Sequence, residues 1–111
     1  DALIVSNHGG RQLDGAQSSI EALPAIAAEV GDKIEVHMDG GIRSGQDVLR
    51  AVAHGASATM IGRAYAYGLG ALGEAGVTRA LELIRAELDV TMALCRLRDV
   101  KDASPAYLRP A

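Results

Sequence analysis

The sequence predicts an α/β fold built on parallel strands, and three observations support this prediction. Short apolar runs alternate three times with longer segments of helical period. The return from each strand to the next spans a dozen or more residues, as a parallel pair requires. Each strand is followed by glycine with an arginine close by, in the stretches NHGGR, DGGIR and IGR. The carboxyl ends of the strands should therefore share one edge of a sheet.

The first unit is a strand over 2–5 followed by a helix. The run Ala2–Val5 is apolar throughout, as in a strand buried on both faces. Ser18 and Glu21 have the spacing of a capping box. Apolar residues at helical spacing follow: Ile20, Leu23, Ile26, Ala27 and Val30. Pro24 predicts that the regular helix begins only there, and Gly31 is placed to end it.

The second unit is a strand over 34–38 that ends at Asp39, Gly40 and Gly41. A helix follows, flanked at its start by Ser44 and Asp47. Gly55 is placed to stop this helix.

The third unit is a strand over 58–61, ended by Gly62 and Arg63, and a long helix. The inner face of that helix is predicted from a stripe at steps of four and three: Val77, Leu81, Ile84, Leu88, Thr91 and Cys95. The stretch GLGALG over 68–73 matches a dinucleotide fingerprint but does not directly follow a strand. We interpret it as a small-residue entry to the helix that permits close packing.

The three strands alone leave two unpaired edges and too few helices to cover both faces of the sheet. Either another chain completes the sheet, or the sequence is a piece of a larger barrel or open sheet. Because the chain begins almost inside a strand, we favour the piece. We expect residues 1–103 to form this partial domain and residues 104–111 to form a tail.

Composition and charge argue against several classes of function. A formal net charge of -3, scattered Lys and Arg and only three Tyr predict no nucleic-acid partner. No His or Cys cluster has metal-ligand spacing, so no metal site is expected. The single cysteine, Cys95, is predicted to lie in the core and fits a reducing compartment. No apolar run approaches the roughly 20 residues of a membrane span.

The loop after the first strand carries two side chains with separable roles. A histidine side chain can accept a proton in one step and return it in another, so His8 is a candidate general base. Arg11 can hold a carboxylate bidentately. The alternatives are that His8 caps the strand end through a backbone hydrogen bond and that Arg11 forms a surface ion pair with Asp14. Both remain open from the sequence.

The loops after the second and third strands have the composition of a phosphate site. Glycine at a strand end permits positive φ and close approach of a ligand to backbone N–H groups, although it is also ordinary turn chemistry. In a β/α barrel, phosphate sites often lie in the loops after the last two strands. Arg63 and the N–H groups would hold the phosphate, and Asp39 would bind a hydroxyl or steady an arginine. His37 and His54 are predicted to be structural.

These stretches together resemble a known family. In order along nearly the whole chain, SNHGGRQLDG, IEALP, MDGGIRSGQDVLRAVAHGA, IGRAYAYGL, GEAGV and ELDVTMAL are similar to the carboxy-terminal part of the FMN-dependent 2-hydroxy acid oxidoreductases. That family includes glycolate oxidase, lactate oxidase and the L-lactate and mandelate dehydrogenases, and NHGGRQLD is its most specific motif here. The resemblance implies a (β/α)8 TIM barrel, of which this chain would be the last three strand-helix units.

The resemblance also implies roles for the loop residues. His8 corresponds to the catalytic base, in contact with substrate, and Arg11 to the arginine that binds the substrate carboxylate. The implied FMN contacts are Asp39, Gly40, Gly41, Ile42, Arg43, Gly62 and Arg63. The family oxidises a 2-hydroxy acid to a 2-oxo acid. Its histidine removes a proton while two electrons pass to the flavin, through a carbanion or as hydride, and then to oxygen, a quinone or another carrier.

Further expectations follow from the same resemblance. The family's upstream lysine and tyrosines have no counterpart in these residues, so the chain alone is expected to be inactive. The parent protein is expected to be a cytoplasmic homotetramer, peripheral to the inner membrane if it is quinone-linked. Two alternatives remain: another FMN- or phosphate-binding barrel enzyme, such as an isomerase or a nucleotide dehydrogenase, and a non-catalytic fragment that pairs its edges with another chain.

Overall fold

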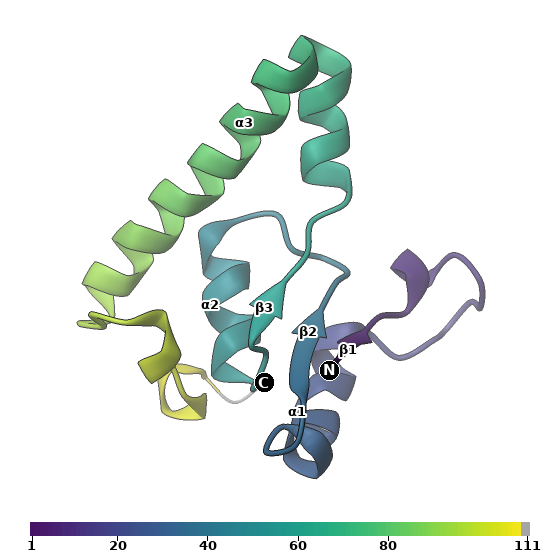
Figure 1. Cartoon of the computed structure of the whole chain (residues 1–111), viewed down its shortest axis with the longest axis vertical. Helices are drawn as coiled ribbons and strands as arrows, with labels where there is room; N and C mark the ends of the chain where they lie inside the picture. The colour runs from purple at the N-terminus through teal and green to yellow at the C-terminus, as the bar shows by residue number, and fades with distance from the viewer. Residues whose placement is uncertain (110–111) are drawn as a thin grey trace.

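The computed structural model describes residues 1–109 and has a parallel sheet at its centre, with the strands in the order β1-β2-β3 (Figure 1). Strand β1 (Ala2–Val5) pairs in parallel with β2 (Glu35–Met38). Strand β3 (Ala58–Thr59) pairs in parallel with the other edge of β2. The predicted alternation of parallel strands with helices is confirmed.

Helices connect the strands and extend beyond the last one. Helix α1 (Ser19–Val30) lies between β1 and β2 in the chain, and α2 (Gly45–Ala53) lies between β2 and β3. Helix α3 (Arg63–Leu94) follows β3. Short 3-10 turns complete the fold: η1 (His8–Gly10), η2 (Val100–Asp102) and η3 (Pro105–Tyr107). The division into a domain over 1–103 and a tail over 104–111 stays a prediction, and its last two residues lie outside the described part.

The core lies between the sheet and helices α1 and α2. Its buried side chains come from the strands, the two helices and the adjoining loops: Val5, Leu23, Val36, Met38, Ile42, Ala51 and Ala56. The opposite face of the sheet is open, because Ile4 is 53% exposed. The prediction that the first strand is buried on both faces is therefore wrong within residues 1–109. The helices of this chain that pack on the sheet cover one face only.

Helix α1 begins earlier than Pro24 predicts. Its first turn is fixed by a capping box in which the Ser18 backbone N–H and the Ser18 hydroxyl donate to Glu21 Oε2, at 3.1 and 2.7 Å. The helix therefore starts at Ser19, and Pro24 lies inside it. The capping contacts and the burial of Leu23 outweigh the single backbone hydrogen bond that proline cannot donate.

The capping box predicts a pH-dependent contribution to stability. The Ser18 hydroxyl and then the Ser18 backbone N–H, by hydrogen bonding to the carboxylate, lower the pKa of Glu21. A lowered pKa stabilises the fold above the pKa of the unfolded chain, and this contribution is lost as the pH falls through the folded pKa. Glu21→Gln is therefore expected to lower the melting temperature at neutral pH, and the difference should shrink as the pH falls below the ordinary glutamate value of 4.5 and vanish only below the lowered pKa of folded Glu21. Thermal unfolding from neutral to acidic pH measures it. Glu29→Gln on the same helix is the matched control.

Strand β3 is shorter than predicted. The strand was expected over 58–61, but it contains only Ala58 and Thr59. Its partner strand ends at Met38, opposite Thr59, and the chain then turns away at Gly40 with φ of +87°. Met60 keeps one bond, from its N–H to the carbonyl of Met38 at 2.9 Å, and then leaves the sheet.

Helix α3 is bent into two arms that double back on each other (Figure 1). The bend occurs at Leu72 and Gly73, where the backbone is not helical and Gly73 has φ of +61°. The arms approach at Gly68 and Gly76, where a Cβ on either glycine would overlap the backbone of the other. The close packing predicted for the small residues over 68–73 is confirmed at Gly68.

The apolar stripe of the second arm is less buried than predicted. Cys95 is half-buried, so the prediction that it lies in the core is wrong. Leu81, in the same stripe, is 52% exposed. The reason is that α3 packs mainly against α2 within residues 1–109. No helix in this part of the chain has the length and apolar character needed to cross a membrane.

Candidate functional site

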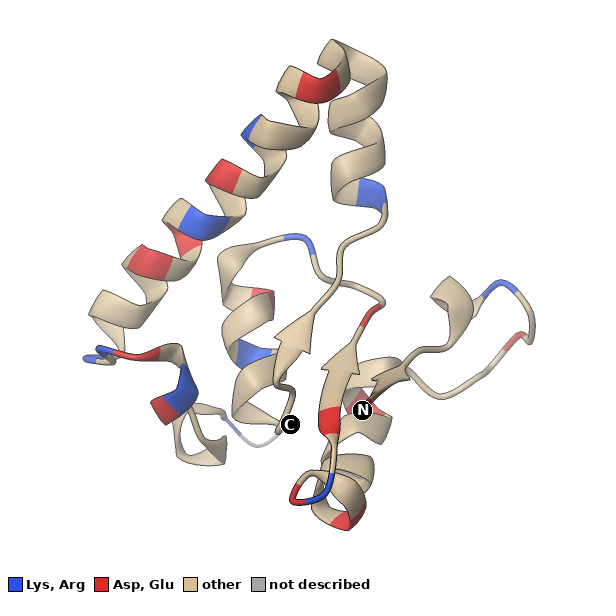
Figure 2. Cartoon of the chain, in the orientation of Figure 1, with Lys and Arg blue, Asp and Glu red and all other residues tan. Residues whose placement is uncertain are grey.

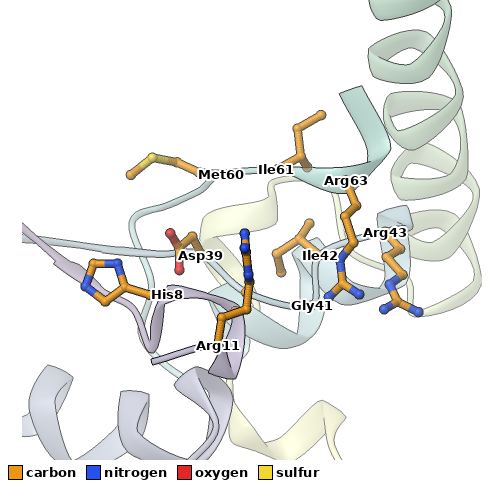
Figure 3. Close-up of a pocket in the computed structure, with 12 residues that line it drawn as sticks. His8, Arg11, Asp39, Gly41, Ile42, Arg43, Met60, Ile61 and Arg63 are labelled. Atoms are coloured by element: carbon orange, nitrogen blue, oxygen red, sulfur yellow. The ribbon is translucent and has the colours of Figure 1, made fainter. Parts of the chain in front are cut away.

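The loops at the carboxyl ends of the three strands line one pocket (Figure 3). Its volume is about 520 Å³, within the usual range of small-molecule sites. The pocket includes every site residue that the sequence predicts: His8, Arg11, Asp39, Gly40, Gly41, Ile42, Arg43, Gly62 and Arg63. Parallel pairing explains this convergence, because it brings the end of each strand to the same edge of the sheet.

Three further residues line the pocket that sequence reasoning did not select. Gly9 lies between His8 and Arg11, while Met60 and Ile61 follow β3. The sequence placed Met60 and Ile61 inside the third strand. Their position just before the glycine-arginine pair is the signal that could have identified them.

The backbone at His8 has an unusual conformation. His8 has φ of +54°, in the left-handed region that non-glycine residues rarely adopt, and Gly9 and Gly10 both have φ of +72°. The His8 backbone N–H donates to the Ser6 hydroxyl at 3.1 Å. The His8 ring makes no hydrogen bond within residues 1–109, so capping of the strand end by this ring is not seen. Such strained residues cluster at functional sites.

The pocket is positively charged on several sides. Arg11, Arg43 and Arg63 line it, and within the described chain none of them forms an ion pair. The alternative in which Arg11 pairs with Asp14 is therefore not seen. Figure 2 shows basic segments at each of the three strand-end loops. In Figure 3 the guanidinium groups of Arg43 and Arg63 lie at one end of the pocket and the His8 ring at the other. The positive charge that lines the pocket favours the binding of anionic groups there.

The loop after β2 presents its backbone and one carboxylate to the pocket. Gly41 has φ of +86°, and a Cβ there would meet no atom within 4 Å. Asp39 is fixed by its backbone N–H, which donates to the Val5 carbonyl at 3.1 Å. The Oδ1 atom of Asp39 is buried and has no hydrogen-bond partner in the described structure. Because buried polar atoms are nearly always satisfied, this oxygen fits a donor on a ligand, such as a hydroxyl.

The N-terminus of α2 is already capped by acidic side chains. Asp47 Oδ2 accepts hydrogen bonds from the backbone N–H groups of Arg43 and Ser44, each at 3.1 Å. Glu87, from the second arm of α3, accepts a hydrogen bond from the Gly45 N–H at 3.0 Å. These carboxylates satisfy the N–H groups that would otherwise attract an anion.

The start of α3 is open by comparison. Gly62 is its N-cap residue, without a capping side chain, and a Cβ on Gly62 would meet nothing within 4 Å. Arg63 is the first residue of the helix. The first N–H groups of a helix attract anions, so a phosphate fits best beside Gly62, within reach of Arg63 and Arg43. The described residues contain no group of three or more His, Cys, Asp or Glu side chains placed to hold a metal ion.

Comparison with known proteins decides the family. The sequence profile described as FMN-dependent dehydrogenase matches residues 1–110. The chain belongs to this family. Since its members use FMN, the open backbone at Gly41 and Gly62, the unpaired Asp39 oxygen and the two arginines match a ligand with a phosphate and hydroxyl groups.

Named relatives and solved structures agree with this family. An L-lactate dehydrogenase from Caulobacter vibrioides is 58% identical over 97% of this chain and 28% of its own length. A pre-mycofactocin synthase from Mycobacterium tuberculosis is 54% identical over 95% of this chain and 26% of its own length. A structure of the monotopic membrane protein (S)-mandelate dehydrogenase superposes with a TM-score of 0.94 at 45% identity, over all of this chain and 29% of that one.

A second solved structure contains the cofactor. A mandelate oxidase variant with an FMN adduct superposes with a TM-score of 0.88 at 50% identity, over 92% of this chain and 32% of that one. The chain thus spans less than a third of the length of these relatives. The family resemblance, its FMN cofactor and the predicted fold, a segment of the FMN-dependent TIM-barrel dehydrogenases, are confirmed.

Proposed function

We propose that this chain supplies the proton acceptor, the substrate-carboxylate site and the phosphate loops of an FMN-dependent enzyme that oxidises a 2-hydroxy acid to a 2-oxo acid. The observation that supports this most strongly is the shared pocket of His8, Arg11, Asp39, Arg43 and Arg63, drawn from three strand ends. Membership in the FMN-dependent dehydrogenase family supports the same proposal.

The substrate end of the pocket is formed by His8 and Arg11. The Arg11 guanidinium binds the substrate carboxylate through paired N–H donors and keeps its charge throughout. This holds the hydroxyl-bearing carbon near His8. Oxidation removes two electrons and two protons, and the His8 imidazole takes one of these protons. When bound, FMN supplies the acceptor for the two electrons. Two routes are compatible with this pocket. His8 can remove the proton from carbon, which gives a carbanion, or it can remove the hydroxyl proton while the hydrogen on carbon leaves as hydride.

The cofactor end is formed by the loops after β2 and β3. Arg43 and Arg63 neutralise the phosphate, Gly41 and Gly62 let it approach the backbone, and Asp39 accepts a hydrogen bond from a hydroxyl. Gly40 and Ile42 complete this loop. The binding energy is thus concentrated on the phosphate, away from the reacting end of the pocket.

Loss of the phosphate contact is expected to weaken cofactor binding. Arg63→Ala removes a charged hydrogen-bond donor whose contribution is about 1.5–3 kcal/mol, so the Kd for FMN should rise roughly 10- to 100-fold. Titration of the apoprotein with FMN, followed by flavin fluorescence, measures this change. Arg85→Ala, on the second arm of α3 outside the pocket, is the matched control. Equal affinities for the two variants would contradict the assignment.

The assay that tests the proposed function is the formation of 2-oxo acid. The flavin-loaded parent protein, of which this chain would be a segment, is supplied with lactate, glycolate or mandelate and with oxygen or a quinone as acceptor. We expect one 2-oxo acid to accumulate for each pair of electrons passed to the acceptor. The neutral amide of the best substrate should react much more slowly, because it offers no carboxylate to Arg11. Absence of product from all three acids would refute the proposal.

A second candidate is an FMN-dependent enzyme that acts on another substrate class. It is favoured by the 54% identity to the pre-mycofactocin synthase. Such an enzyme would bind FMN through the same loops, so the effect of Arg63→Ala would persist. It would show no preference for a free carboxylate beside the hydroxyl, and the comparison of acid with amide therefore separates the two candidates. A non-catalytic fragment, the third alternative, would give no product and would pair the open edges of its sheet with another chain.

Assembly and location are further parts of the proposal. We propose a homotetramer in the cytoplasm, with attachment to the inner membrane surface if a quinone is the acceptor. The description of (S)-mandelate dehydrogenase as a monotopic membrane protein is consistent with such attachment in a relative. Light scattering of the purified protein and its distribution between membrane and supernatant fractions test the two statements.

A further inference from the structure

Asn7 joins the two ends of the loop that carries His8 and Arg11. Its side-chain amide Nδ2 donates to the carbonyl of Gln17 at 3.3 Å. Its own carbonyl accepts the backbone N–H of Gly10 at 2.9 Å. Residues 11–15, between these contacts, are exposed to solvent. The loop is therefore held mainly at its ends, and Asn7 takes part in both attachments.

Asn7 also lies beside Gly40, in the loop that would hold the cofactor. A Cβ on Gly40 would lie 3.6 Å from Asn7 Oδ1 and 3.0 Å from the hydroxyl of Ser19. Ser19 is buried at the first turn of α1. The Asn7 side chain thus lies where the substrate loop, the cofactor loop and the start of α1 meet. A displacement of Asn7 would change the position of His8 relative to Gly40.

The left-handed conformation of His8 is the reason why the placement of Asn7 matters for the site. A non-glycine residue with φ of +54° persists only where its surroundings impose that conformation. The Ser6 hydroxyl holds the His8 N–H, and the Asn7 carbonyl holds the Gly10 N–H two residues later. Asn7 ties this turn to the far end of its loop through the bond to the Gln17 carbonyl, and its Oδ1 lies beside Gly40; the local contact from Ser6 does neither.

We propose that Asn7 is a positioning residue that sets the distance between the His8-Arg11 pair and the Gly40-Gly41 backbone. It does not touch the reacting atoms and acts through the turn it holds. The proposal rests on the proposed function in one respect, the expected loss of turnover. Its structural consequence, a rigid turn at His8 to Gly10, is independent of that function.

The test compares Asn7→Ala and Asn7→Leu with a matched control in the flavin-loaded parent protein. Leucine keeps the approximate shape against Gly40 and removes the hydrogen-bonding atoms. Gln17→Ala is the control, because it keeps the carbonyl that Asn7 binds and removes only an exposed side chain. The measurements are kcat and KM for a 2-hydroxy acid, the Kd for FMN, the melting temperature, and hydrogen exchange at the Gly10 amide.

For both Asn7 variants we expect kcat/KM to fall about 10- to 100-fold, since misplacement of a reacting group by about 1 Å has effects of this size. Gly10 amide exchange should accelerate, while the Kd for FMN and the melting temperature stay close to those of Gln17→Ala. Unchanged kcat/KM, or a parallel fall in FMN affinity and folding, would overturn the proposal. If the parent protein oxidises no 2-hydroxy acid, the proposed function fails and Gly10 exchange decides: acceleration supports the positioning role, and unchanged exchange overturns it.

Discussion

His8→Ala is expected to lower the turnover of a 2-hydroxy acid by about 10²- to 10⁴-fold, the usual contribution of a positioned general base. The physical reason is that His8 supplies the only histidine ring that lines the pocket among the described residues, and this ring makes no hydrogen bond within residues 1–109. FMN affinity should change little, because the guanidinium groups of Arg43 and Arg63 lie at the other end of the pocket (Figure 3). Steady-state kinetics and an FMN titration measure the two effects separately.

His54→Ala is the matched control for this variant. His54 is the C-cap residue of α2 and lies outside the pocket. The His54→Ala variant should retain the kinetic constants of the unsubstituted protein. If His8→Ala also kept full activity, the proton acceptor would have to be a group other than His8. A joint loss of FMN binding and activity would instead place His8 at the cofactor end.

Arg11→Lys should lower kcat/KM by roughly 10- to 100-fold, even though the charge is kept. A lysine ammonium cannot reproduce the paired donors that match a carboxylate, and a charged hydrogen bond contributes about 1.5–3 kcal/mol. The measurement is kcat/KM for a 2-hydroxy acid and for its neutral amide. The unsubstituted protein and Arg11→Lys should differ in kcat/KM for the acid and have similar kcat/KM for the amide.

The control for Arg11→Lys is Arg98→Lys, at an exposed position outside the pocket. It should leave both rates unchanged. An equal fall in kcat/KM for the acid and the amide in Arg11→Lys would show that Arg11 acts on the loop or on the cofactor. It would contradict the assignment of Arg11 as the substrate-carboxylate site.

Helix starts were predicted best where residues close in sequence are enough to define them. Ser44 and Asp47 have capping-box spacing, and the structure shows this capping box at the start of α2. Pro24 was misleading because a proline disfavours helix locally, whereas the capping box that begins six residues earlier, at Ser18, had already set the helical path. Local propensity was outweighed by a stronger local signal and by the burial of Leu23.

Long-range packing accounts for the other errors. Whether Ile4 or Cys95 is buried depends on which elements cover them, and one sequence does not show this. The end of β3 depends on where its partner turns away at Gly40. Glu87, which caps α2 from 42 residues away, has no signal in the sequence near α2.

The pocket residues were more predictable than the packing. Parallel strands bring their carboxyl ends together. The three glycine-arginine loops that follow the strands, which contain His8, Asp39 and Gly62, therefore had to converge. The left-handed backbone of His8 and the hydrogen bond from Asn7 to Gln17 could not be predicted, because they depend on the three-dimensional path of the loop and not on residue types alone. Met60 and Ile61 were missed because the end of β3 was misplaced.

The most direct test of the central claim is a single anaerobic turnover. The flavin-loaded parent protein is mixed with lactate, glycolate or mandelate in the absence of any acceptor, and the visible absorbance of the oxidised flavin is followed. We expect at least one acid to bleach the flavin and to yield one equivalent of 2-oxo acid, and His8→Ala to slow this bleaching by about 10²-fold or more. Flavin that stays oxidised with all three acids, or that is bleached equally fast in His8→Ala, would contradict this expectation.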